Sequence, residues 1–389
     1  MSGRFSGPKV VFVLKDGIRG HENQSAGVAR WLKRLVGADV FDIEIPRLSG
    51  LQRFVLYKIQ ARKLIKDSPE ISFDWLGKAE ALSLHGSVTR MIDSSGVRND
   101  EVLFLSAGSA GAPFCLSLAK ATGGKCACLM TPSVLGTTPF DFAIVPEHDF
   151  PEPSPNLLAT LGAPNMIGAG LSETEERSLA SRFPSKAEKK WSILIGGDDA
   201  NYSIPPEWAE NVLKALLETA KKTGADVFIT TSRRTLPATE EKIAEMVKGS
   251  PHVRMLVLGS KDPWNPVPAM LGACQRVFCT EDSVSMISEA VTGGHVVQIL
   301  RVERKRGLRK CLQGLTAKMV DKNLLARQRL WGIPRFDLMI ESFCSRGLAM
   351  EYDPAKLDQV SPARGRKNEG LSFSEARRAA EWIIQEWES

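Results

Sequence analysis

The sequence predicts an α/β protein built from two doubly wound domains. Short apolar runs rich in Val, Ile and Phe alternate with helical patterns along most of the chain. The alternation occurs twice, and a segment with four prolines, residues 146–156, separates the two series. At 389 residues the chain is also too long for one ordinary hydrophobic core. Strands that alternate with helices typically form parallel sheets with helices on both faces.

The first series predicts a domain over residues 1–170. Apolar, β-branched runs of this length favour strands, and apolar residues three and four apart favour helices. We expect strands at 9–14, 39–45, 101–106, 125–130 and 142–146, and helices at 24–35 and 113–121. Proline can continue neither element, so residues 146–156 are expected to join the two domains.

The second series predicts a domain over residues 186–350. Its expected strands are 191–195, 226–230, 253–258, 276–280 and 296–300, with helices at 207–222, 238–248, 266–273 and 283–292. Residues 351–389 form a tail with an amphipathic helix at 371–387, begun by a Ser cap. We expect this helix to pack back on the first domain.

Composition excludes several classes of protein. Apolar residues make up 43% of the chain, and no run approaches the ~18 residues that would span a bilayer. The N-terminus has no apolar region typical of a signal peptide, so we expect a cytoplasmic protein. The seven cysteines show no metal-binding spacing, so reduced core residues are expected.

Positive charge is concentrated in one segment. The net charge is +6, but residues 301–335 hold eleven Lys or Arg and two acidic residues, which makes that segment +9 and the rest −3. This block predicts an anionic partner such as phosphates or lipid headgroups, and the alternative is a solvated basic face. Nucleic acid is disfavoured because the block contains one aromatic residue, Trp331.

Polar loops follow three strands of the second domain, where ligands of doubly wound sheets bind. Gly196 and Gly197 follow one strand, and their free N–H groups suit a phosphate or hydroxyl. The next loop has the residues of an anion clamp: Thr231, Ser232, Arg233 and Arg234. An ordinary turn and a solvated helix start are the alternative interpretations.

The third loop leads into a helix. Glu281, Asp282 and Ser283 stand where that helix begins, and Ser285 and Glu289 are four residues apart on one face of it. The two acceptor oxygens of Glu289 match the two donors of a ribose diol. Its alternative role is an exposed helix carboxylate. Together the three loops predict a nucleotide site.

Several segments carry a resemblance to a known family. "KDGIRGHENQSAGVARWL", "PEHD", "LIGGDD", "TTSRRT" and "NPVPAMLGACQRVFCTEDSVSMISEAVTGG" resemble the family named after a plant mitochondrial-fission ELM factor. Its bacterial members are described as candidate glycosyltransferases. The similarity spans residues 9–345. The second domain is also similar to the donor half of the peptidoglycan N-acetylglucosaminyltransferase. The resemblance implies a GT-B fold of two facing Rossmann-like domains.

The resemblance also implies a nucleotide-sugar donor in the second domain. Gly196 and Gly197 would line its diphosphate or sugar, and Glu289 would bind the ribose. The other implied contacts are Ser283, Ser285 and Met286 at the diphosphate, with Trp264 and Asn265 near the base. Basic side chains and helix N-termini would stabilise the leaving group, so we expect no metal and no cofactor. The acidic pair Asp198–Asp199 is the metal alternative.

The stretch "GIRGHENQSAG", residues 17–27, follows the first strand. In the peptidoglycan enzyme a Gly-rich loop ending in His occupies this position in the acceptor domain. Inverting sugar transfer needs a general base, for which we expect His21 first and Asp16 second. The expected acceptor contacts are Gly17, Gly20, Glu22, Asn23 and Gln24, and Glu22 would alternatively orient His21. The structural alternative is that His21 caps the helix or bonds within the loop.

Residues 51–66 combine Phe, Tyr and Leu with five Lys or Arg, which is typical of a helix on a membrane surface or of an ordinary domain helix. The first interpretation predicts a lipid-linked or cell-envelope glycan acceptor and a peripheral position on the inner membrane face. The sequence therefore predicts a glycosyltransferase. A nucleotide-sugar epimerase of the same fold and a non-enzymatic membrane adaptor remain as alternatives.

Overall fold

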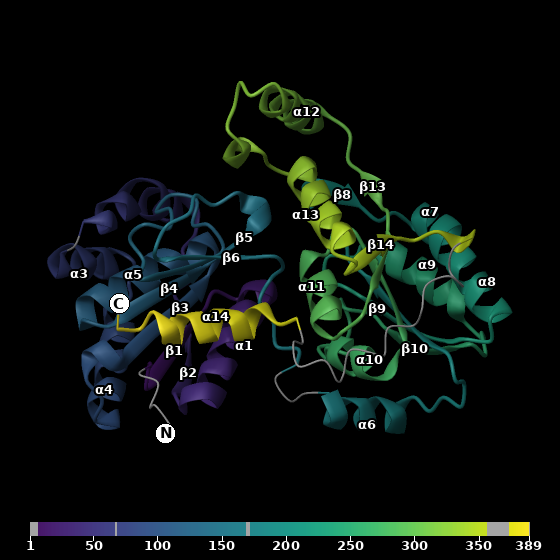
Figure 1. Cartoon of the computed structure of the whole chain (residues 1–389), viewed down its shortest axis with the longest axis horizontal. Helices are drawn as coiled ribbons and strands as arrows, with labels where there is room; N and C mark the ends of the chain where they lie inside the picture. The colour runs from purple at the N-terminus through teal and green to yellow at the C-terminus, as the bar shows by residue number, and fades with distance from the viewer. Residues whose placement is uncertain (1–6, 67, 169–171, 356–372, 389) are drawn as a thin grey trace. The chain divides into compact units, whose positions relative to one another are not determined.

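The computed structural model describes residues 7–66, 68–168, 172–355 and 373–388, and Figure 1 shows its elements. The chain forms two units. Unit 1 comprises Met1–Ala169 with Ser374–Ser389, and unit 2 comprises Gly170–Phe373.

Unit 1 is built on a parallel sheet of six strands in the order β2-β1-β3-β4-β5-β6. The strands are β1 (Val10–Lys15), β2 (Asp39–Glu44), β3 (Val102–Ala107), β4 (Lys125–Leu129), β5 (Phe142–Pro146) and β6 (Leu157–Thr160). The longer helices are α1 (Arg19–Val36), α3 (Pro69–Lys78), α4 (Leu82–Ser95), α5 (Gly108–Thr122) and α14 (Glu375–Gln385). From β1 the chain moves outward to β2 and then returns to β3, so the strand order reverses between β1 and β3.

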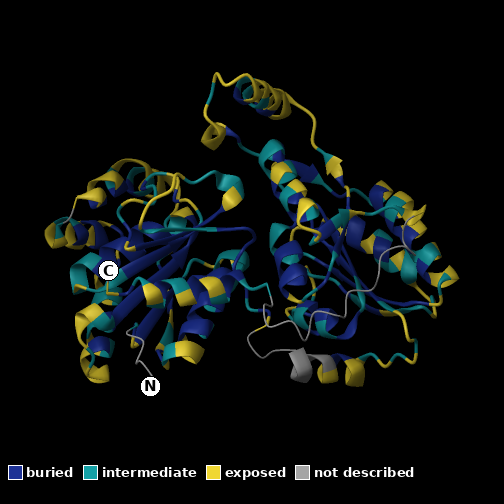
Figure 2. Cartoon of the chain, in the orientation of Figure 1, coloured by how far each residue is buried: buried dark blue, intermediate teal, exposed yellow. Residues whose placement is uncertain are grey.

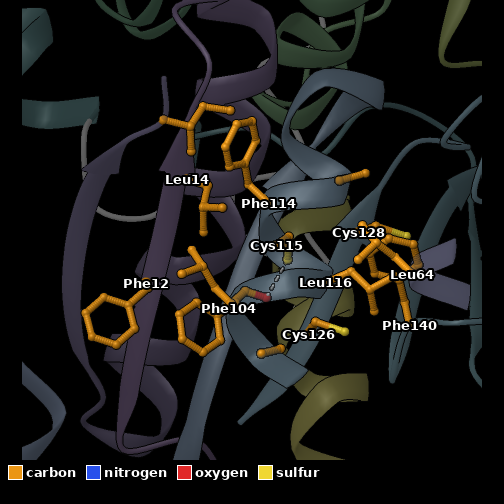
Figure 3. Packing of buried hydrophobic residues seen from close by; sticks show 14 of the residues in the cluster. Phe12, Leu14, Leu64, Phe104, Phe114, Cys115, Leu116, Cys126, Cys128 and Phe140 are labelled. Atoms are coloured by element: carbon orange, nitrogen blue, oxygen red, sulfur yellow. Dashed lines mark hydrogen bonds between the residues drawn. The ribbon is translucent and has the colours of Figure 1, made fainter. Parts of the chain in front are cut away.

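The sheet of unit 1 is buried on both faces, which explains its continuous apolar strands. Side chains of a strand alternate between faces, so Phe12 and Leu14 join the cluster shown in Figure 3, with Phe104, Phe114 and Leu64. Val11 and Val13 join the cluster on the other face, which α1 and α14 cover. Ser374 caps α14 by accepting a hydrogen bond from the Arg377 N–H at 3.3 Å. Of the helix expected at 371–387, residues 371 and 372 lie outside the described ranges.

Three local expectations for unit 1 are wrong. The proline-rich segment 146–156 does not separate the units, because β6 follows it and pairs with β5. Helix α1 begins five residues earlier than position 24, at Arg19. Residues 51–66 do not form one regular helix: α2 (Gly50–Phe54) passes into a π-helical segment, η1 (Val55–Gln60), and a 3₁₀ segment, η2 (Ala61–Ile65).

Unit 2 contains a second parallel six-stranded sheet, in the order β10-β9-β7-β11-β12-β14. Its strands are β7 (Lys190–Ile195), β9 (Asp226–Thr231), β10 (Val253–Val257), β11 (Arg276–Thr280), β12 (Val297–Leu300) and β14 (Ala349–Glu351). A short antiparallel ladder joins β8 (Tyr202–Ser203) to β13 (Glu303–Arg304). In this sheet the strand order reverses between β7 and β11. The predicted architecture of two doubly wound domains is confirmed.

The helices of unit 2 alternate with these strands. They are α6 (Ser172–Arg182), α7 (Pro206–Trp208), α8 (Lys214–Lys222), α9 (Pro237–Val247), α10 (Val267–Ala273), α11 (Val284–Thr292), α12 (Leu308–Asp321) and α13 (Ile333–Ser345). A π-helical segment, η5 (Ala209–Leu213), joins α7 to α8. Figure 2 shows buried strands inside each unit and exposed residues on the outer helices, with α12 mostly exposed.

The remaining short elements are the 3₁₀ segments η3 (Asn99–Glu101), η4 (Glu147–Asp149) and η6 (Arg327–Arg329). All seven cysteines are free thiols, five of them buried. Burial raises the pKa of the Cys126 and Cys128 thiols well above its usual value, which keeps them protonated and unreactive. Within the described ranges, no helix combines the length and apolar character needed to cross a membrane.

Candidate functional site

The strand-order reversal of unit 1 gathers the residues of the predicted catalytic loop. Asp16 and Gly17 follow β1, Gly108 follows β3, and His21 lies in the first turn of α1. In doubly wound sheets the crevice at such a reversal, beyond the carboxyl ends of the strands, is where ligands bind. The position alone therefore makes these residues candidates for chemistry.

His21 and Asp16 form a close pair. Nδ1 of His21 lies 2.7 Å from Oδ2 of Asp16, and the two side chains are 22% and 4% exposed. The other carboxylate oxygen of Asp16 accepts a hydrogen bond from the Ile18 N–H at 2.9 Å. A carboxylate fixed in this way holds the imidazole ring in one orientation and directs Nε2 away from itself. The two candidate bases of the sequence are thus parts of one arrangement.

Glu22 does not orient His21. Its Oε1 accepts a hydrogen bond from the Gly17 N–H at 3.0 Å. Gly17 has a φ of +80°, and a Cβ there would lie 2.4 Å from the Arg47 guanidinium, so the position requires glycine. The other expected acceptor contacts lie within α1: Gly20 and Asn23 are half-buried, and Gln24 is buried.

A pocket of about 330 Å³ opens in unit 1 at the start of α5, next to Gly108 in the sequence. It is lined by side chains from α2 and η1, by the start of α5, and by the loop after β4: Gly50, Arg53, Phe54, Tyr57, Lys58, Ser109, Ala110, Pro113, Pro132, Ser133, Val134 and Leu135. Ser109 follows Gly108 directly, and its hydroxyl accepts a hydrogen bond from the Ser133 N–H at 2.9 Å. Sequence reasoning missed this pocket, whose one signal was the Gly-rich stretch 107–113 after a strand.

The pocket combines apolar walls with positive charge. Arg53 and Lys58 stand among Phe54, Tyr57 and Leu135. Burial raises the pKa of Tyr57 to about 12, so its phenol stays protonated and can donate a hydrogen bond. The first N–H groups of α5 add a partial positive charge at the same end. These features suit a ligand with an anionic group attached to an apolar part.

In unit 2 the reversal between β7 and β11 gathers the predicted Gly-Gly loop and the start of the third loop. The expectation that both glycine N–H groups are free is wrong. The Gly196 N–H donates to Oγ1 of Thr280 at 2.7 Å, and the Gly197 N–H donates to Oδ2 of Asp282 at 2.8 Å. A Cβ on Gly196 would lie 2.1 Å from that same oxygen. These glycines let the two loops pack against each other.

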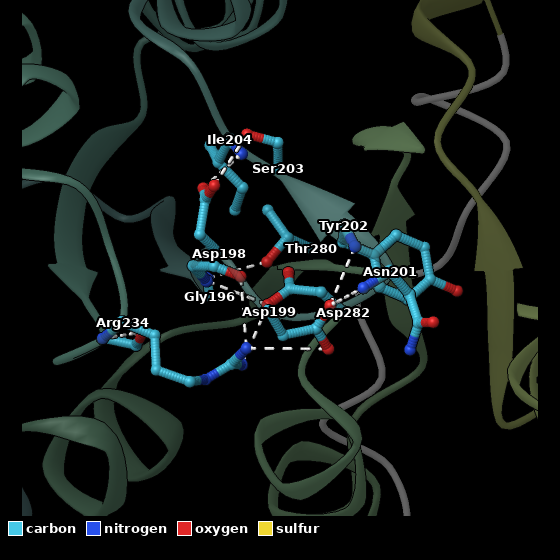
Figure 4. A network of polar contacts seen from close by, with 12 residues as sticks. Gly196, Asp198, Asp199, Asn201, Tyr202, Ser203, Ile204, Arg234, Thr280 and Asp282 are labelled. Atoms are coloured by element: carbon cyan, nitrogen blue, oxygen red, sulfur yellow. Dashed lines mark hydrogen bonds and ion pairs between the residues drawn. The ribbon is translucent and has the colours of Figure 1, made fainter. Parts of the chain in front are cut away.

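Arg234 closes this network, as Figure 4 shows. Its guanidinium donates to Oδ2 of Asp282 at 3.0 Å and to the Gly197 carbonyl at 3.1 Å. Burial raises the pKa of Asp282, against the hydrogen bonds from Thr280, the Gly197 N–H and Arg234. One of the two arginines of the predicted anion clamp is therefore paired with a protein carboxylate, although Arg233 and Arg234 are both exposed.

The acidic pair Asp198–Asp199 makes hydrogen bonds within the loop that follows β7. The carboxylate of Asp198 accepts hydrogen bonds from the Ile204 N–H and the Ser203 hydroxyl and lies 3.2 Å from Nζ of Lys305. Asp199 accepts hydrogen bonds from the N–H groups of Asn201 and Tyr202. Among the described residues, no group of three or more His, Cys, Asp or Glu side chains is arranged to hold a metal ion.

A buried glutamate joins two loops at the carboxyl ends of β9 and β10. The Thr231 hydroxyl donates to Glu240 at 2.5 Å, and its oxygen accepts from the Gly259 N–H at 2.8 Å. The Ser260 hydroxyl also donates to Glu240. Ser232 accepts from the Arg234 N–H at 3.0 Å. Glu240 is not among the residues that the sequence predicts for the site.

Glu281 occupies a buried ion-pair cluster. Its side chain is fully buried and lies 2.6 Å from Arg301 and 3.3 Å from Arg304. Its second oxygen accepts from the Val302 N–H at 2.9 Å. The two arginines also pair with Asp337, and Arg301 pairs with Glu351. These contacts fix Glu281 against other residues of unit 2. They also pair Arg301 and Arg304, the first two cations of the basic block, with carboxylates.

Helix α11 begins at this same reversal. Ser283 is buried at its N-terminal cap, Ser285 and Met286 are half-buried in the first turn, and Glu289 is 6% exposed. Glu289 is therefore not the exposed carboxylate of the alternative interpretation. Asn265 accepts from the Val267 N–H at 3.3 Å. Trp264 stacks on Phe183, with the Arg182 guanidinium 4.1 Å from its ring centre.

Both units are Rossmann-like domains that place polar side chains at the reversal of the strand order, which defines a class of two-domain, ligand-binding α/β proteins. Residues 19–387 match the family described as Mitochondrial fission ELM1, and the chain belongs to this family. The resemblance read from the sequence is confirmed. Comparison with curated proteins finds no match.

Three solved structures illustrate what the chain is similar to. UDP-GlcNAc 2-epimerase from Neisseria meningitidis bound to UDP-GlcNAc is 14% identical, with 97% of this chain and 98% of that chain covered and a TM-score of 0.47. A UDP-glucosyltransferase from Polygonum tinctorium is 13% identical, with 99% of each chain covered and a TM-score of 0.46. MurG from Acinetobacter baumannii is 12% identical, with 97% of this chain and 100% of that chain covered and a TM-score of 0.42.

Proposed function

We propose that the protein is a glycosyltransferase that moves a sugar from a nucleotide-sugar donor to an anionic, lipid-linked or cell-envelope glycan, with inversion and without a metal. The observation that carries this proposal is the His21–Asp16 pair at the reversal of the strand order in unit 1. A histidine oriented by a buried carboxylate is suited to accept a proton from a hydroxyl group.

In the proposed reaction Nε2 of His21 takes the proton of the acceptor hydroxyl. The acceptor oxygen then forms a bond to C1 of the donor sugar, while the bond from C1 to the diphosphate oxygen breaks. The nucleoside diphosphate leaves with the bonding electron pair. Asp16 stabilises the imidazolium because its carboxylate lies 2.7 Å from Nδ1.

Unit 2 supports the donor half of the proposal. The first N–H groups of α11 have no acceptor within the helix, so they suit a diphosphate. Ser285 and Met286 lie in that first turn, and Glu289 follows one turn later on the same face as Ser285. Arg233 and Arg234 are both exposed, but Arg234 pairs with Asp282, so Arg233 is the member of the pair assigned to supply charge to the leaving group.

The pocket of unit 1 supports an acceptor with an anionic and an apolar part. Arg53 and Lys58 suit a phosphate, and Phe54 and Leu135 suit an adjoining lipid or apolar group. Ser109 lies next to Gly108, so an acceptor seated there would be close to His21.

Two measurements test the proposal in sequence. The first is a thermal-shift screen of nucleoside diphosphates and nucleotide sugars, since a ligand at 100 times its Kd adds about 2.7 kcal/mol to stability. The second compares turnover of wild type and His21→Ala with the best donor and a lipid-linked glycan extract. We expect a loss of roughly 10²–10⁴-fold with donor affinity unchanged.

The alternatives make different predictions in these assays. An epimerase converts the nucleotide sugar when no acceptor is present, whereas the proposed transferase releases the nucleoside diphosphate only when acceptor is added. A membrane adaptor gains no stability from any nucleotide. Full activity of both His21→Ala and Asp16→Asn would remove the pair from the mechanism.

A further inference from the structure

Most of the basic block, residues 305–330, forms an exposed helix and loop on unit 2. Residues 305–330 contain eight Lys or Arg and one acidic residue, which gives a net charge of +7. Helix α12 occupies most of this segment, and Figure 2 shows that its surface is largely exposed. None of the donor-site residues of the proposed function lies in this segment.

Contacts on one side of α12 determine which face points inward. Gln313 is buried and donates a hydrogen bond to Asn201 at 2.8 Å, and Val320 is buried two turns later. The Arg309 guanidinium lies 4.9 Å from the ring centre of Trp331. These contacts leave the opposite face of the helix to solvent.

That outer face carries leucines. Leu308, Leu312 and Leu315 follow at spacings of four and three, so they share one stripe, and they are 76%, 47% and 56% exposed. Leu324, just beyond the helix, is 66% exposed. A stripe of this kind costs free energy in water and is common where a partner covers it.

Cations border the stripe. Lys318 and Lys322 lie ten and fourteen residues after Leu308, a spacing that places them along one edge of the stripe, and both are exposed. An apolar stripe beside lysines matches a membrane surface, which offers acyl chains below a layer of anionic headgroups. A soluble polyanion would use the charges and leave the leucines in water.

We propose that α12 docks this protein on an anionic lipid bilayer, with Leu308, Leu312 and Leu315 inserted among the headgroups and Lys318 and Lys322 at the lipid phosphates. The surface differs from the one predicted at residues 51–66 and belongs to the other unit. The inference does not rest on the proposed reaction, because vesicle binding is measured without sugar transfer.

The test is vesicle flotation of the full chain. Wild type is expected to float with vesicles in which about a third of the lipid is phosphatidylglycerol, and not with phosphatidylcholine alone. Leu312→Asn with Leu315→Asn should weaken binding at least roughly tenfold, because less apolar area enters the bilayer. Lys318→Glu with Lys322→Glu should weaken it by roughly 25-fold or more.

Matched controls keep the test specific. Leu236→Asn with Leu338→Asn changes two other exposed leucines of unit 2, and Lys222→Glu with Lys248→Glu makes the same change of charge elsewhere. Both controls should bind as wild type does. The α12 side chains changed are exposed, so all variants are expected to keep the wild-type melting temperature.

Three results would overturn the proposal. The first is wild type that fails to float with anionic vesicles. The second is full vesicle binding by the Leu312 and Leu315 variant, together with heparin that displaces the protein from the vesicles. That result would make the basic block a binding site for soluble polyanions. The third is loss of binding in Leu51→Asn with Phe54→Asn alone, which would move membrane contact to unit 1.

Discussion

The His21 ring occupies space that is open because residue 108 is a glycine. A Cβ at Gly108 would lie 2.4 Å from Cε1 of His21 and 2.7 Å from Nδ1, and Gly108 has a φ of +75°. The residues that directly follow two neighbouring strands, Asp16 after β1 and Gly108 after β3, thus determine the position of the imidazole.

Gly108→Ala should therefore impair catalysis. The methyl group must displace the ring from Asp16, so we expect turnover to fall at least roughly tenfold while nucleotide affinity stays within twofold. Stability should fall by about 1–2 kcal/mol because of the positive φ. Gly96→Ala, at a φ of +64° with open space around it, is the matched control for backbone strain. Equal loss of activity in both variants would contradict a role for Gly108 in positioning His21.

Glu289→Ala and Ser285→Ala test the donor site. Each removes a hydrogen-bond partner from one face of α11, so we expect nucleoside-diphosphate binding to weaken by roughly 1.5–3 kcal/mol for the carboxylate and less for the hydroxyl. Isothermal titration calorimetry measures the change. Because Glu289 is buried, Glu289→Gln serves as the variant that keeps the side-chain volume. Unchanged affinity in all three variants would exclude this face of α11.

Glu281→Ala separates a structural role from a donor-binding role. The side chain is fully buried, but its partners Arg301 and Arg304 are 42% and 33% exposed and can be rehydrated. We therefore expect a loss of about 1–3 kcal/mol in unfolding free energy, below the usual figure for a wholly buried pair. Urea denaturation measures it, with the more exposed Glu351→Ala costing at most about 1 kcal/mol.

If Glu281 contacts the donor instead, the outcome differs. Nucleotide affinity would then fall in Glu281→Gln, a variant that keeps the hydrogen bond from the Val302 N–H possible. We expect that affinity to be unchanged.

Glu375 predicts a pH dependence for unit 1. Burial raises the pKa of this carboxyl, against the Arg378 guanidinium and the Leu161 N–H that bond to it. The folded state thus binds this proton more tightly than the unfolded chain does. Its contribution to stability is present at pH below the unfolded pKa and is lost as the pH rises through the folded pKa.

Glu375→Gln should consequently stabilise the protein at neutral pH. The difference from wild type should shrink as the pH falls toward 4, where the wild-type carboxyl is protonated too. Thermal unfolding across this range measures it. Glu381→Gln, on the same helix with a half-exposed side chain, should show no such trend. A constant gap between Glu375→Gln and wild type would contradict the assignment.

The strands were predictable because both faces of each sheet are buried, which makes them continuous apolar runs such as Val10–Leu14. Strands β6 and β14 were not, because each is short, lies at the edge of its sheet and has only one buried residue. The start of α1 was missed because Gly20 disfavours a helix locally. Gly27 is retained because a Cβ there would lie 2.4 Å from the Asn165 carbonyl oxygen.

The candidate site was predictable in position but not in detail. Strand ends identify the loops, and His21 and Asp16 were named because they follow the first strand; the structure places them in contact. The use of the glycine N–H groups depends on Thr280 and Asp282, 84 and 85 residues away in the sequence. The local sequence pattern contains no information on such distant partners, so the N–H groups of Gly196 and Gly197 were predicted to be free. The pocket lined by Tyr57 could not be predicted for the same reason, because its walls come from segments far apart in the sequence.

Helix α14 covers one face of the unit 1 sheet although all of unit 2 separates it from the rest of that unit in sequence. During synthesis on the ribosome, residues up to 169 emerge with α1 but without α14, which packs on α1 and β6. The part of this face that α14 covers stays exposed, or is held by a chaperone, until about 200 further residues have been made. Unit 2 meets no such delay and can fold first, so the order of folding would be the reverse of the order of synthesis.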